Sequence, residues 1–596
     1  MKNLLHLNKY LFKYRWRLLL GILFVALSNV FGVLPPQVIR HAFNLVKENI
    51  EYYQLYNGFE LQSSFYRVFS SAVIFFALAV LLLAVMKGIF MFFMRQTMIV
   101  MSRLIEYDFR NEIYEHYQKL TTAFYKRHRT GDMMSRITED VNRVRMYLGP
   151  ALMYSVNLTV LIVIVVGTML QVNVELTLYA LIPLPILSIS IYYVNNIINR
   201  RSEEIQRQLS NLTSIAQESY SGIRVLKAYT QENVTNAFFD KESEYYKEKS
   251  LKLALVQALF FPLMLTLIGV SVIITIYIGG QQVINGYLTS GNIAEFVIYI
   301  NMLTWPVTSI GWVASIIQRA EASQERINEF LKAEPEITSP NEDALTLKGA
   351  VKLDNVSFTY PDTGIKALQN ISFQLKPGEK MALIGRTGSG KSTIAEILVR
   401  KYDVSEGQVL MDDVDVRALN LSALRAQIGY VPQDVFLFSD TIRDNIAFGK
   451  EEASMEEIRQ AVERAVILKE IDELPEKFLT LVGERGVTLS GGQKQRISLA
   501  RALIKDPQLL IFDDCLSAVD ANTEHVIISN LNEYLNDKTA IIITHRIFSL
   551  MNFDKIVVLE HGRIVEEGTH ESLMSAKGYY FDLYEKQRLE DKKMAV

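Results

Sequence analysis

The sequence has almost no cysteine and almost no net charge, and each shortage argues against a class of protein. Cys515 is the single cysteine, so the chain can form no disulfide within itself, and a cysteine-based metal site is not expected. The formal net charge is −3 and the pI is near 6.3, which gives no reason to expect a nucleic acid as partner.

The composition does not fit one solvent environment. Hydrophobic residues make up 49% of the chain and the mean hydropathy is +0.14, which is too apolar for an ordinary soluble protein. Charged residues nevertheless make up 21%, which is too many for a protein that lies in a membrane alone. A chain of 596 residues is long enough for several domains. We therefore expect a membrane part joined to a soluble part.

Long apolar runs are confined to the first half of the chain. A membrane-spanning helix needs roughly 20 mostly apolar residues. After Ile317 no further run of that kind occurs. Six runs before it qualify, at about 17–39, 69–96, 148–171, 174–197, 254–280 and 292–318.

Lysine and arginine are distributed unevenly between the loops that join these runs. The short connections 172–173 and 281–291 contain neither residue, whereas the N-terminus and the long segments 98–147 and 198–253 are basic. Because basic loops stay on the cytoplasmic side, we expect both termini and both long segments in the cytoplasm.

The two long cytoplasmic segments are polar and have few helix-breaking residues. The spacing of Ile105, Phe109, Ile113 and Tyr117 predicts that membrane helices continue into the cytoplasm. Each segment contains one break, KRHRTGD at 126–132 and SYSGIRVLKAY at 219–229. We expect these turns, at the far ends of long helical hairpins, to contact another domain.

A second domain follows the last apolar run. Residues 1–335 are expected to form an all-α transmembrane domain of six helices, and 336–347 read as an acidic, proline-containing linker. Residues 348–590 then alternate helical stretches with short β-rich runs, namely KMALIG, QVLMD, IGYVPQ, LLIFD, AIIITH and KIVVLE. The fold class is therefore multidomain, with the helical transmembrane domain followed by an α/β P-loop domain.

The segment GRTGSGKS, residues 385–392, matches the phosphate-binding pattern G-x-x-x-x-G-K-[ST] between a strand and a helix. Backbone N–H groups of such a loop surround phosphates, and the helix N-terminus favours negative charge. Lys391 would reach the β- and γ-phosphates of ATP, and the Ser392 hydroxyl would bind Mg²⁺. The predicted nucleotide-binding residues here are Gly385, Arg386, Thr387, Gly388, Ser389, Gly390, Lys391, Ser392 and Thr393.

Two acids end the apolar run LLIFDD, which predicts a buried strand that delivers carboxylates to a site at its C-terminal edge. Asp513 would complete the Mg²⁺ site with Ser392. The alternative, a capping aspartate, would leave Ser392 without an acidic counterpart. Asp514 stands where a general base could act.

The segment LSGGQ at 489–493 resembles the signature of ATP-binding-cassette (ABC) proteins. Four further residues follow the order of that family: Tyr360 in SFTYP, Gln433 in YVPQD, Asp520 in SAVD and His545 in IITHR. Six apolar segments ahead of one cassette resemble an ABC exporter half-transporter. The resemblance covers roughly residues 15–585.

The resemblance implies a role for each of these residues. Tyr360 would stack on adenine, Gln433 would sense Mg²⁺ and the attacking water, and His545 would contact the γ-phosphate. Ser490 and Gly492 would bind a phosphate of the ATP held by the opposite cassette, and Asp520 would join the nucleotide-binding set. The resemblance therefore implies a dimer in which two ATP molecules lie between two cassettes.

Asp514 departs from the family pattern, which usually has glutamate at this position. A carboxylate shortened by one methylene can lose the reach that a general base needs, while Mg²⁺ and ATP binding remain. We favour an asymmetric pair of two different chains, in which this site is weakly hydrolytic. A homodimer that tolerates aspartate is the alternative.

By resemblance, the function is ATP-driven export of a hydrophobic or amphipathic substrate, such as a drug, a lipid or a lipid-linked molecule. The expected location is the bacterial plasma (inner) membrane, in contact with membrane lipids. An ATP-gated channel or a regulatory membrane receptor on the same fold is the alternative. Lys87, inside the second apolar run, would contact an anionic headgroup, reach the membrane surface or pair with an acid.

Overall fold

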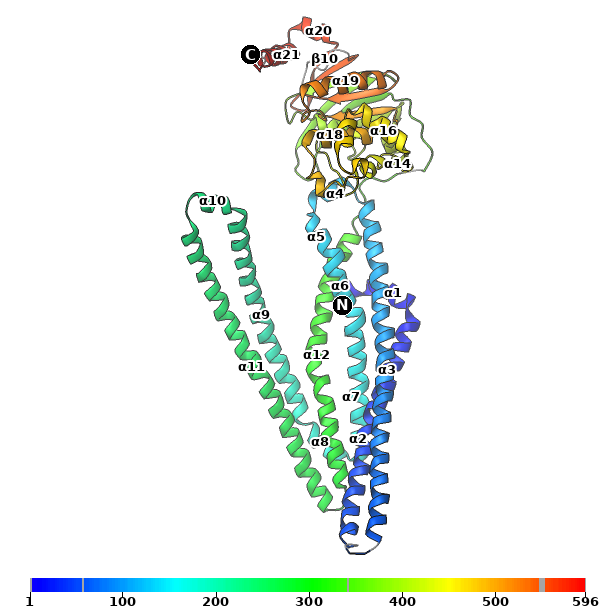
Figure 1. The fold of residues 1–596 in the computed structure, drawn as a ribbon, viewed down its shortest axis with the longest axis vertical. Coiled ribbons are helices and arrows are strands. Elements are labelled where there is room, and N and C mark those ends of the chain that lie inside the picture. Colours follow the sequence, from blue (N-terminus) through cyan, green and yellow to red (C-terminus); the bar gives the residue numbers. More distant parts are fainter. Residues whose placement is uncertain (1–2, 56–57, 60, 340–341, 546–552, 595–596) are drawn as a thin grey trace. The chain divides into compact units, whose positions relative to one another are not determined.

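A computed structural model describes residues 3–55, 58–59, 61–339, 342–545 and 553–594 (Figure 1). The chain divides into two compact units. The first, here called the membrane unit, comprises Met1–Gln118 and Gly131–Ala333. The second, the cassette unit, comprises Glu334–Val596 together with Lys119–Thr130, a short segment from the first half of the chain.

The membrane unit consists of helices joined by short connections, and its described residues include no strand. It contains six stretches of helix that are long and apolar enough to span a membrane, as the sequence predicts: Arg15–Ile50, Gln62–Lys119, Thr130–Val172, Val174–Ser221, Glu232–Ile284 and Ser290–Leu331. Within these stretches the helices are α2 (Arg15–Leu55), α3 (Leu61–Lys119), α5 (Thr130–Ser135), α6 (Val141–Met146), α7 (Leu152–Val172), α8 (Val174–Leu181), α9 (Pro183–Ser221), α11 (Glu232–Ile284) and α12 (Ser290–Leu331).

The helical extensions predicted from apolar spacing are present in α3. Ile105, Phe109 and Ile113 are all buried, which agrees with the i, i+4, i+8 pattern. The α9 and α11 helices lie side by side as an antiparallel hairpin, with α10 (Ile223–Ala228) at its tip (Figure 1). This tip coincides with the second predicted break.

The first predicted break is present at 128–129, and a further break, which the sequence did not predict, lies at 120–121. Helix α3 ends at Lys119, and a separate short helix, α4 (Thr122–Arg127), follows before α5 begins at Thr130. Thr121 has extended backbone immediately before α4, as an N-cap residue does. The segment Lys119–Thr130 belongs to the cassette unit, and Ala123 is part of that unit's hydrophobic core.

The cassette unit is built on two sheets. A six-stranded sheet has the order β10-β9-β3-β8-β7-β6, and its central strands are parallel and almost completely buried. A four-stranded antiparallel sheet has the order β2-β1-β4-β5. The strands are β1 (Val351–Thr359), β2 (Lys366–Leu375), β3 (Lys380–Gly385), β4 (Glu406–Met411), β5 (Val414–Asp415), β6 (Ile428–Val431), β7 (Leu509–Asp513), β8 (Thr539–Ile543), β9 (Lys555–Glu560) and β10 (Arg563–Gly568).

Helices cover these sheets and complete two large apolar clusters. The first cluster packs α13 (Lys391–Leu398) between the two sheets, and the second packs β6 and β7 against α16, α18 and α19. The remaining helices are α14 (Leu421–Ala426), α15 (Ile442–Ala447), α16 (Met455–Arg464), α17 (Leu468–Glu473), α18 (Gly491–Leu503), α19 (Ala521–Tyr534), α20 (His570–Ala576) and α21 (Tyr579–Met594).

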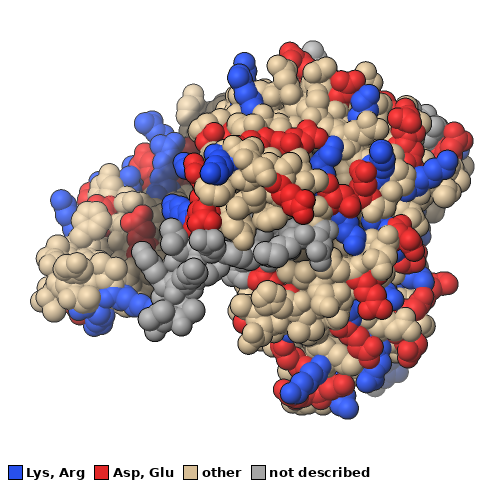
Figure 2. Space-filling model, turned by 90° about the horizontal axis from the view of Figure 1, so that it is seen from above, with Lys and Arg blue, Asp and Glu red and all other residues tan. Residues whose placement is uncertain are grey.

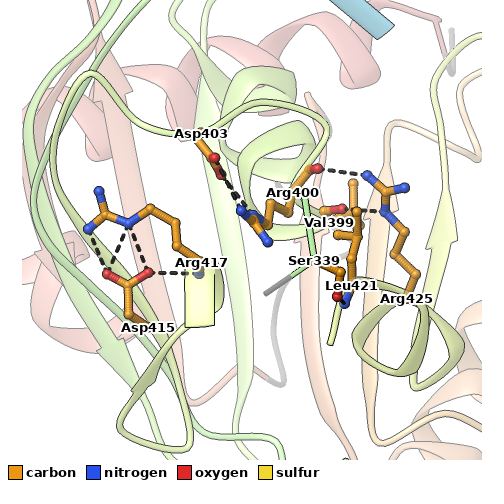
Figure 3. Close-up of polar contacts among 8 residues, drawn as sticks. All are labelled: Ser339, Val399, Arg400, Asp403, Asp415, Arg417, Leu421 and Arg425. Atoms are coloured by element: carbon orange, nitrogen blue, oxygen red, sulfur yellow. Dashed lines mark hydrogen bonds and ion pairs between the residues drawn. The ribbon is translucent and has the colours of Figure 1, made fainter. Parts of the chain in front are cut away.

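Polar contacts connect α14 to the end of α13 and to the segment before β1 (Figure 3). The Arg425 guanidinium donates to the carbonyls of Val399 and Arg400 at 3.1 and 2.7 Å. The Leu421 N–H donates to the Ser339 hydroxyl at 3.1 Å. These bonds fix the C-terminal end of α13, whose N-terminal end carries residues predicted to bind phosphate.

Charges of both signs are mixed on the surface. On the face drawn in Figure 2, lysine and arginine side chains alternate with aspartate and glutamate among the described residues. The described residues of this face therefore form no extended patch of one sign.

Candidate functional site

The loop between β3 and α13 holds backbone that only glycine adopts easily. Gly388 and Gly390 have φ values of 81° and 101°, in the left-handed region. A Cβ at Gly390 would lie 2.7 Å from the Ala367 carbonyl oxygen, whereas at Gly388 it would meet open space. Gly388 thus leaves a free approach to the loop backbone, as phosphate binding requires.

Lys391 is buried at the start of α13. Its ammonium donates hydrogen bonds to the carbonyls of Gly385 and Arg386 at 2.8 and 2.9 Å, so it lies across the loop. Burial lowers the pKa of Lys391, against the opposing effect of the Asp513 and Asp514 carboxylates. A phosphate would restore favourable charge interactions to this buried ammonium.

Asp513 and Ser392 meet where β7 ends. All five residues of β7 are buried, so the strand carries the Asp513 carboxylate into the interior. The Ser392 hydroxyl donates to it at 3.0 Å. Burial raises the pKa of Asp513 and the neighbouring Asp514 carboxylate adds to this, whereas the Ser392 hydrogen bond opposes both. A cation at this point would favour the ionised carboxylate.

Asp514 directs its carboxylate from a sharp turn. Its φ is 48°, and its N–H donates to the Ile543 carbonyl at 2.9 Å, which ties the turn to the end of β8. The Gln433 amide donates to the Asp514 carboxylate at 3.3 Å. Asp514 and Gln433 therefore form one polar pair beside the buried Asp513.

These groups surround a single cavity of about 520 Å³. Predicted residues that line it are Tyr360, Thr387, Gly388, Gly390, Lys391, Ser392, Thr393, Gln433, Asp513, Asp514 and His545. Burial, followed by the charge of Lys391, lowers the pKa of His545, so the imidazole is neutral at neutral pH. The cavity therefore combines a phosphate-binding loop, two carboxylates, an amide and a neutral histidine.

Six predicted residues do not line this cavity. They are Gly385, Arg386 and Ser389 of the loop, and Ser490, Gly492 and Asp520 elsewhere in the cassette. Ser490 caps α18 by accepting from the Gln493 N–H at 3.2 Å, and Asp520 caps α19 by accepting from the Thr523 N–H at 3.0 Å. Gly492 is buried, and a Cβ there would lie 2.9 Å from the Ala518 carbonyl oxygen.

Tyr360 is held at one end of the cavity by several contacts. Its hydroxyl lies 2.9 Å from the Thr393 hydroxyl and donates to Glu396 at 3.2 Å. The Lys126 ammonium, from α4, lies 5.0 Å from the centre of the Tyr360 ring and 5.1 Å from that of Tyr402. Lys126 therefore links the segment Lys119–Thr130 to the residue predicted to contact adenine.

Sequence reasoning missed Lys126 and also the turn between β9 and β10. His561 and Gly562 in this turn line the cavity, and the Gly562 N–H donates to the Ser389 carbonyl at 3.2 Å. The dipeptide His-Gly after a strand indicates a turn but carries no information about which loop the turn meets. Lys126 belongs to the segment 126–132, which was expected to contact another domain, but nothing local indicates that it meets Tyr360, more than two hundred residues later in the chain.

Comparisons with known proteins agree with this geometry. The family described as "ABC transporter transmembrane region" matches residues 18–307, and the family described as "ABC transporter" matches residues 368–517. A probable multidrug resistance ABC transporter ATP-binding/permease protein, YheI of Bacillus subtilis (strain 168), is 36% identical over 97% of this chain and 96% of its own. The multidrug resistance-like ATP-binding protein MdlA of Escherichia coli (strain K12) is 34% identical over 97% and 96%.

Two further proteins extend the comparison to lipid transport and to structure. An ATP-dependent lipid A-core flippase of Syntrophus aciditrophicus (strain SB) is 35% identical over 86% of each chain. The solved structure of a bacterial Atm1-family ABC exporter with ATP bound has a TM-score of 0.74 at 27% identity, covering 96% of this chain and 98% of that one. The chain therefore belongs to the ABC transporter family, as a fused half-transporter that couples ATP hydrolysis in its cassette to export.

Proposed function

We propose that this chain exports an amphipathic or hydrophobic molecule, a drug or a lipid, as one of two half-transporters in a plasma-membrane complex. The observation that carries the two-chain arrangement is the composition of the cavity. It contains the phosphate-binding loop, Asp513, Gln433 and His545, but not Ser490 or Gly492. One chain thus presents two separate parts of an ATP site, and a second cassette completes each.

The substrate class is argued from the relatives. Two of them are named as multidrug resistance proteins and one as a lipid A-core flippase. Drugs of that kind and lipids share a large apolar surface with a polar end, which suits a path between membrane helices. Both termini and the cassette would lie in the cytoplasm, because the basic segments of the sequence lie on that side.

Each predicted site residue has a proposed part in ATP binding or hydrolysis. Tyr360 stacks on adenine, residues 385–393 bind the phosphates through their backbone and through Lys391, and His545 donates a hydrogen bond to the γ-phosphate. Gln433 and Asp514 position the attacking water, with Asp514 as general base. Ser490, Gly492 and Asp520 act across the interface, on the ATP of the partner.

Mg²⁺ fits the oxygen atoms that meet at the end of β7. Protein sites for Mg²⁺ use one or two carboxylates together with substrate phosphates and water, rather than a cage of acids. Ser392 and Asp513 would hold it, with Gln433 nearby, and among the described residues no group of three or more His, Cys, Asp or Glu forms a competing site. Bound Mg²⁺ would neutralise the charge that develops on the phosphates during hydrolysis.

The partner is proposed to be a different chain. Asp514 is one methylene shorter than the glutamate usual in the family, which makes this cavity the weaker of two ATP sites. The signature residues Ser490 and Gly492 would then complete the stronger site, whose base the partner provides. Native mass spectrometry of the complex purified from its own host would show two kinds of chain, and a single kind would establish a homodimer.

The export itself is tested in inside-out membrane vesicles. We expect ATP-dependent uptake of a fluorescent amphipathic dye or of a fluorescent phospholipid, and no uptake with Lys391→Ala. A nucleotide-gated ion current in a planar bilayer, with no ATP-dependent uptake of either probe, would instead identify a channel.

A further inference from the structure

The hairpin of α9 and α11 contains a basic cavity that takes no part in ATP binding. It has a volume of about 400 Å³ and is lined by Ile197, Arg200, Arg201, Glu204, Lys249 and Lys252. It lies where the apolar segments of the two helices, 174–197 and 254–280, give way to charged sequence. This position corresponds to the headgroup level of a membrane.

Most of the charge in this cavity is not neutralised by the protein. Among the described residues, no carboxylate lies within ion-pair distance of Arg200, Arg201 or Lys249, and Lys249 lies 4.5 Å from the centre of the Tyr245 ring. Of these four cations, only Lys252 has an ion pair within the described part of the chain, with Glu248 at 2.6 Å, and Lys249 interacts with the same carboxylate at longer range. Four cations therefore face one acid of the cavity lining, and three of them are available to an external anion.

The two sides of the cavity are held in register by the hairpin. Just beyond it, the Gln208 amide donates to the Glu242 carboxylate at 2.6 Å and the Asn211 amide donates to the same carboxylate at 3.0 Å. Following the antiparallel register from this contact places Arg201 of α9 opposite Lys249 of α11. The cations from the two helices therefore converge without any rearrangement.

Apolar stripes lead away from the cavity along both helices. On α9, Ile197, Tyr193 and Ile189 recur at four-residue spacing and are all exposed. On α11, Leu255 and Leu259 recur at the same spacing and are also exposed. A molecule held by its charged end in the cavity would place an apolar portion along these stripes.

We propose that this cavity binds the phosphate headgroup of an anionic membrane phospholipid, with the acyl chains along the two stripes. Basic pockets between transmembrane helices bind anionic headgroups in this manner. Arginine suits the role because its planar guanidinium matches two phosphate oxygens at once. Zwitterionic lipids carry a compensating ammonium, so they gain less from the unpaired cations.

The test measures lipid retained by the purified complex in native mass spectrometry. The protein is equilibrated in micelles containing equimolar phosphatidylglycerol and phosphatidylethanolamine. We expect a clear preference for phosphatidylglycerol in the native protein. In Arg201→Gln/Lys249→Gln the preference falls roughly 30-fold, because each cation near an anionic group contributes about fivefold.

The matched control is Arg207→Gln/Lys247→Gln, which removes one cation from each of the same helices. Arg207 and Lys247 are ion-paired with Glu203 and Glu244 and lie outside the cavity, so the preference is retained. The charge-conserving variant Arg201→Lys keeps most of the preference and loses only the two-oxygen contact of the guanidinium. Unchanged ATP binding shows that the cassette of each variant is folded, and the retained preference in the control shows that the hairpin tolerates the loss of two cations.

Three results would overturn the proposal. The first is equal retention of both lipids by the native protein, and the second is an equal loss of preference in the control variant. The third separates a lipid from a free phosphate. Glycerol 3-phosphate should leave the bound lipid in place at concentrations where added phosphatidylglycerol exchanges with it, and complete displacement by glycerol 3-phosphate would show that the acyl chains do not contribute.

Discussion

Replacing Asp514 with asparagine tests whether this carboxylate is the base that drives turnover of the complex. Asparagine keeps the size of the side chain and can still accept the hydrogen bond that Gln433 donates at 3.3 Å. It cannot accept a proton from water. The substitution therefore removes basicity while it leaves the local geometry in place.

The expected magnitude depends on how the two ATP sites share turnover. In the asymmetric pair, Asp514→Asn reduces steady-state ATPase activity by less than about twofold, because the partner's site supplies most of it. Asp514→Glu extends the carboxylate by one C–C bond, about 1.5 Å. Since a misplacement of about 1 Å can cost ~100-fold in rate, the longer side chain raises hydrolysis at this site by up to ~100-fold.

The assay is phosphate release by the purified complex and by this chain alone, with ATP binding measured in parallel. Binding should be the same for native protein, Asp514→Asn and Asp514→Glu. The reasoning is refuted if this chain hydrolyses ATP briskly without a partner and Asp514→Asn nearly abolishes that activity. Asp514 would then be a fully competent base in a homodimer.

Four other substitutions or treatments give direct tests. Lys391→Ala should abolish ATP binding by calorimetry, and normal binding would refute the loop assignment. Gly492→Ala should reduce ATPase activity far more than Asp514→Asn, because a Cβ at this position would lie 2.9 Å from the Ala518 carbonyl oxygen. An equal effect of the two substitutions would count against an ATP site completed by Gly492 across the dimer interface. Lys126→Met should lower the amount of substrate moved per ATP hydrolysed while ATP still binds, since two cation–ring contacts worth about 1 kcal/mol each are lost. An unchanged ratio would show that Lys126 does not help to couple ATP hydrolysis to transport. Burial raises the pKa of Cys515 to about 12, so at pH 8 only about one thiol in ten thousand is thiolate. Maleimide should therefore label Cys515 only after the cassette unfolds, and rapid labelling of the native protein would contradict this.

The strands that the sequence predicted best are those buried on both faces. The runs KMALIG, LLIFD and KIVVLE correspond to β3, β7 and β9, because a parallel strand between two layers is apolar along its whole length. By contrast, β1 alternates buried and partly exposed residues, and β2 pairs with it in an antiparallel sheet. Such strands contain many polar residues and lack a continuous apolar run, so β1 and β2 were not predicted as strands.

The helical breaks show where local signals are weak. The tip near Gly222 was located correctly, since α9 ends at Ser221 and α10 begins at Ile223. The first break, predicted at 126–132, is present between the end of α4 at Arg127 and the start of α5 at Thr130, but the further break between Lys119 and Thr122 was not predicted. The capping residue Thr121 was an available signal.

The candidate site was predictable where one strand or loop carries several functional groups. Residues 385–393 and Asp513–Asp514 each lie on one short continuous stretch of chain, so their spacing largely specifies their geometry. Lys126 and His561 come from distant elements, and only the folded chain brings them to the cavity. For Lys87, the described residues contain no ion pair with an acid, and its side chain instead lies against Gly32 of α2.

A second property of Asp514 bears on why aspartate stands at this position. Its φ of 48° lies in the left-handed region, where aspartate and asparagine occur several times more often than other side chains. Glutamate lacks the short polar group that bonds locally, so Asp514→Glu should destabilise the turn by up to about 1 kcal/mol. For a unit of this size that lowers the Tm of the cassette by roughly 2–4 °C, whereas Asp514→Asn leaves it unchanged. If the Tm falls while hydrolysis does not rise, aspartate is needed at this position for the conformation of the turn, and its short side chain does not limit catalysis. If hydrolysis rises despite the lower Tm, the short side chain limits catalysis, and the asymmetric pair is the better account of this transporter.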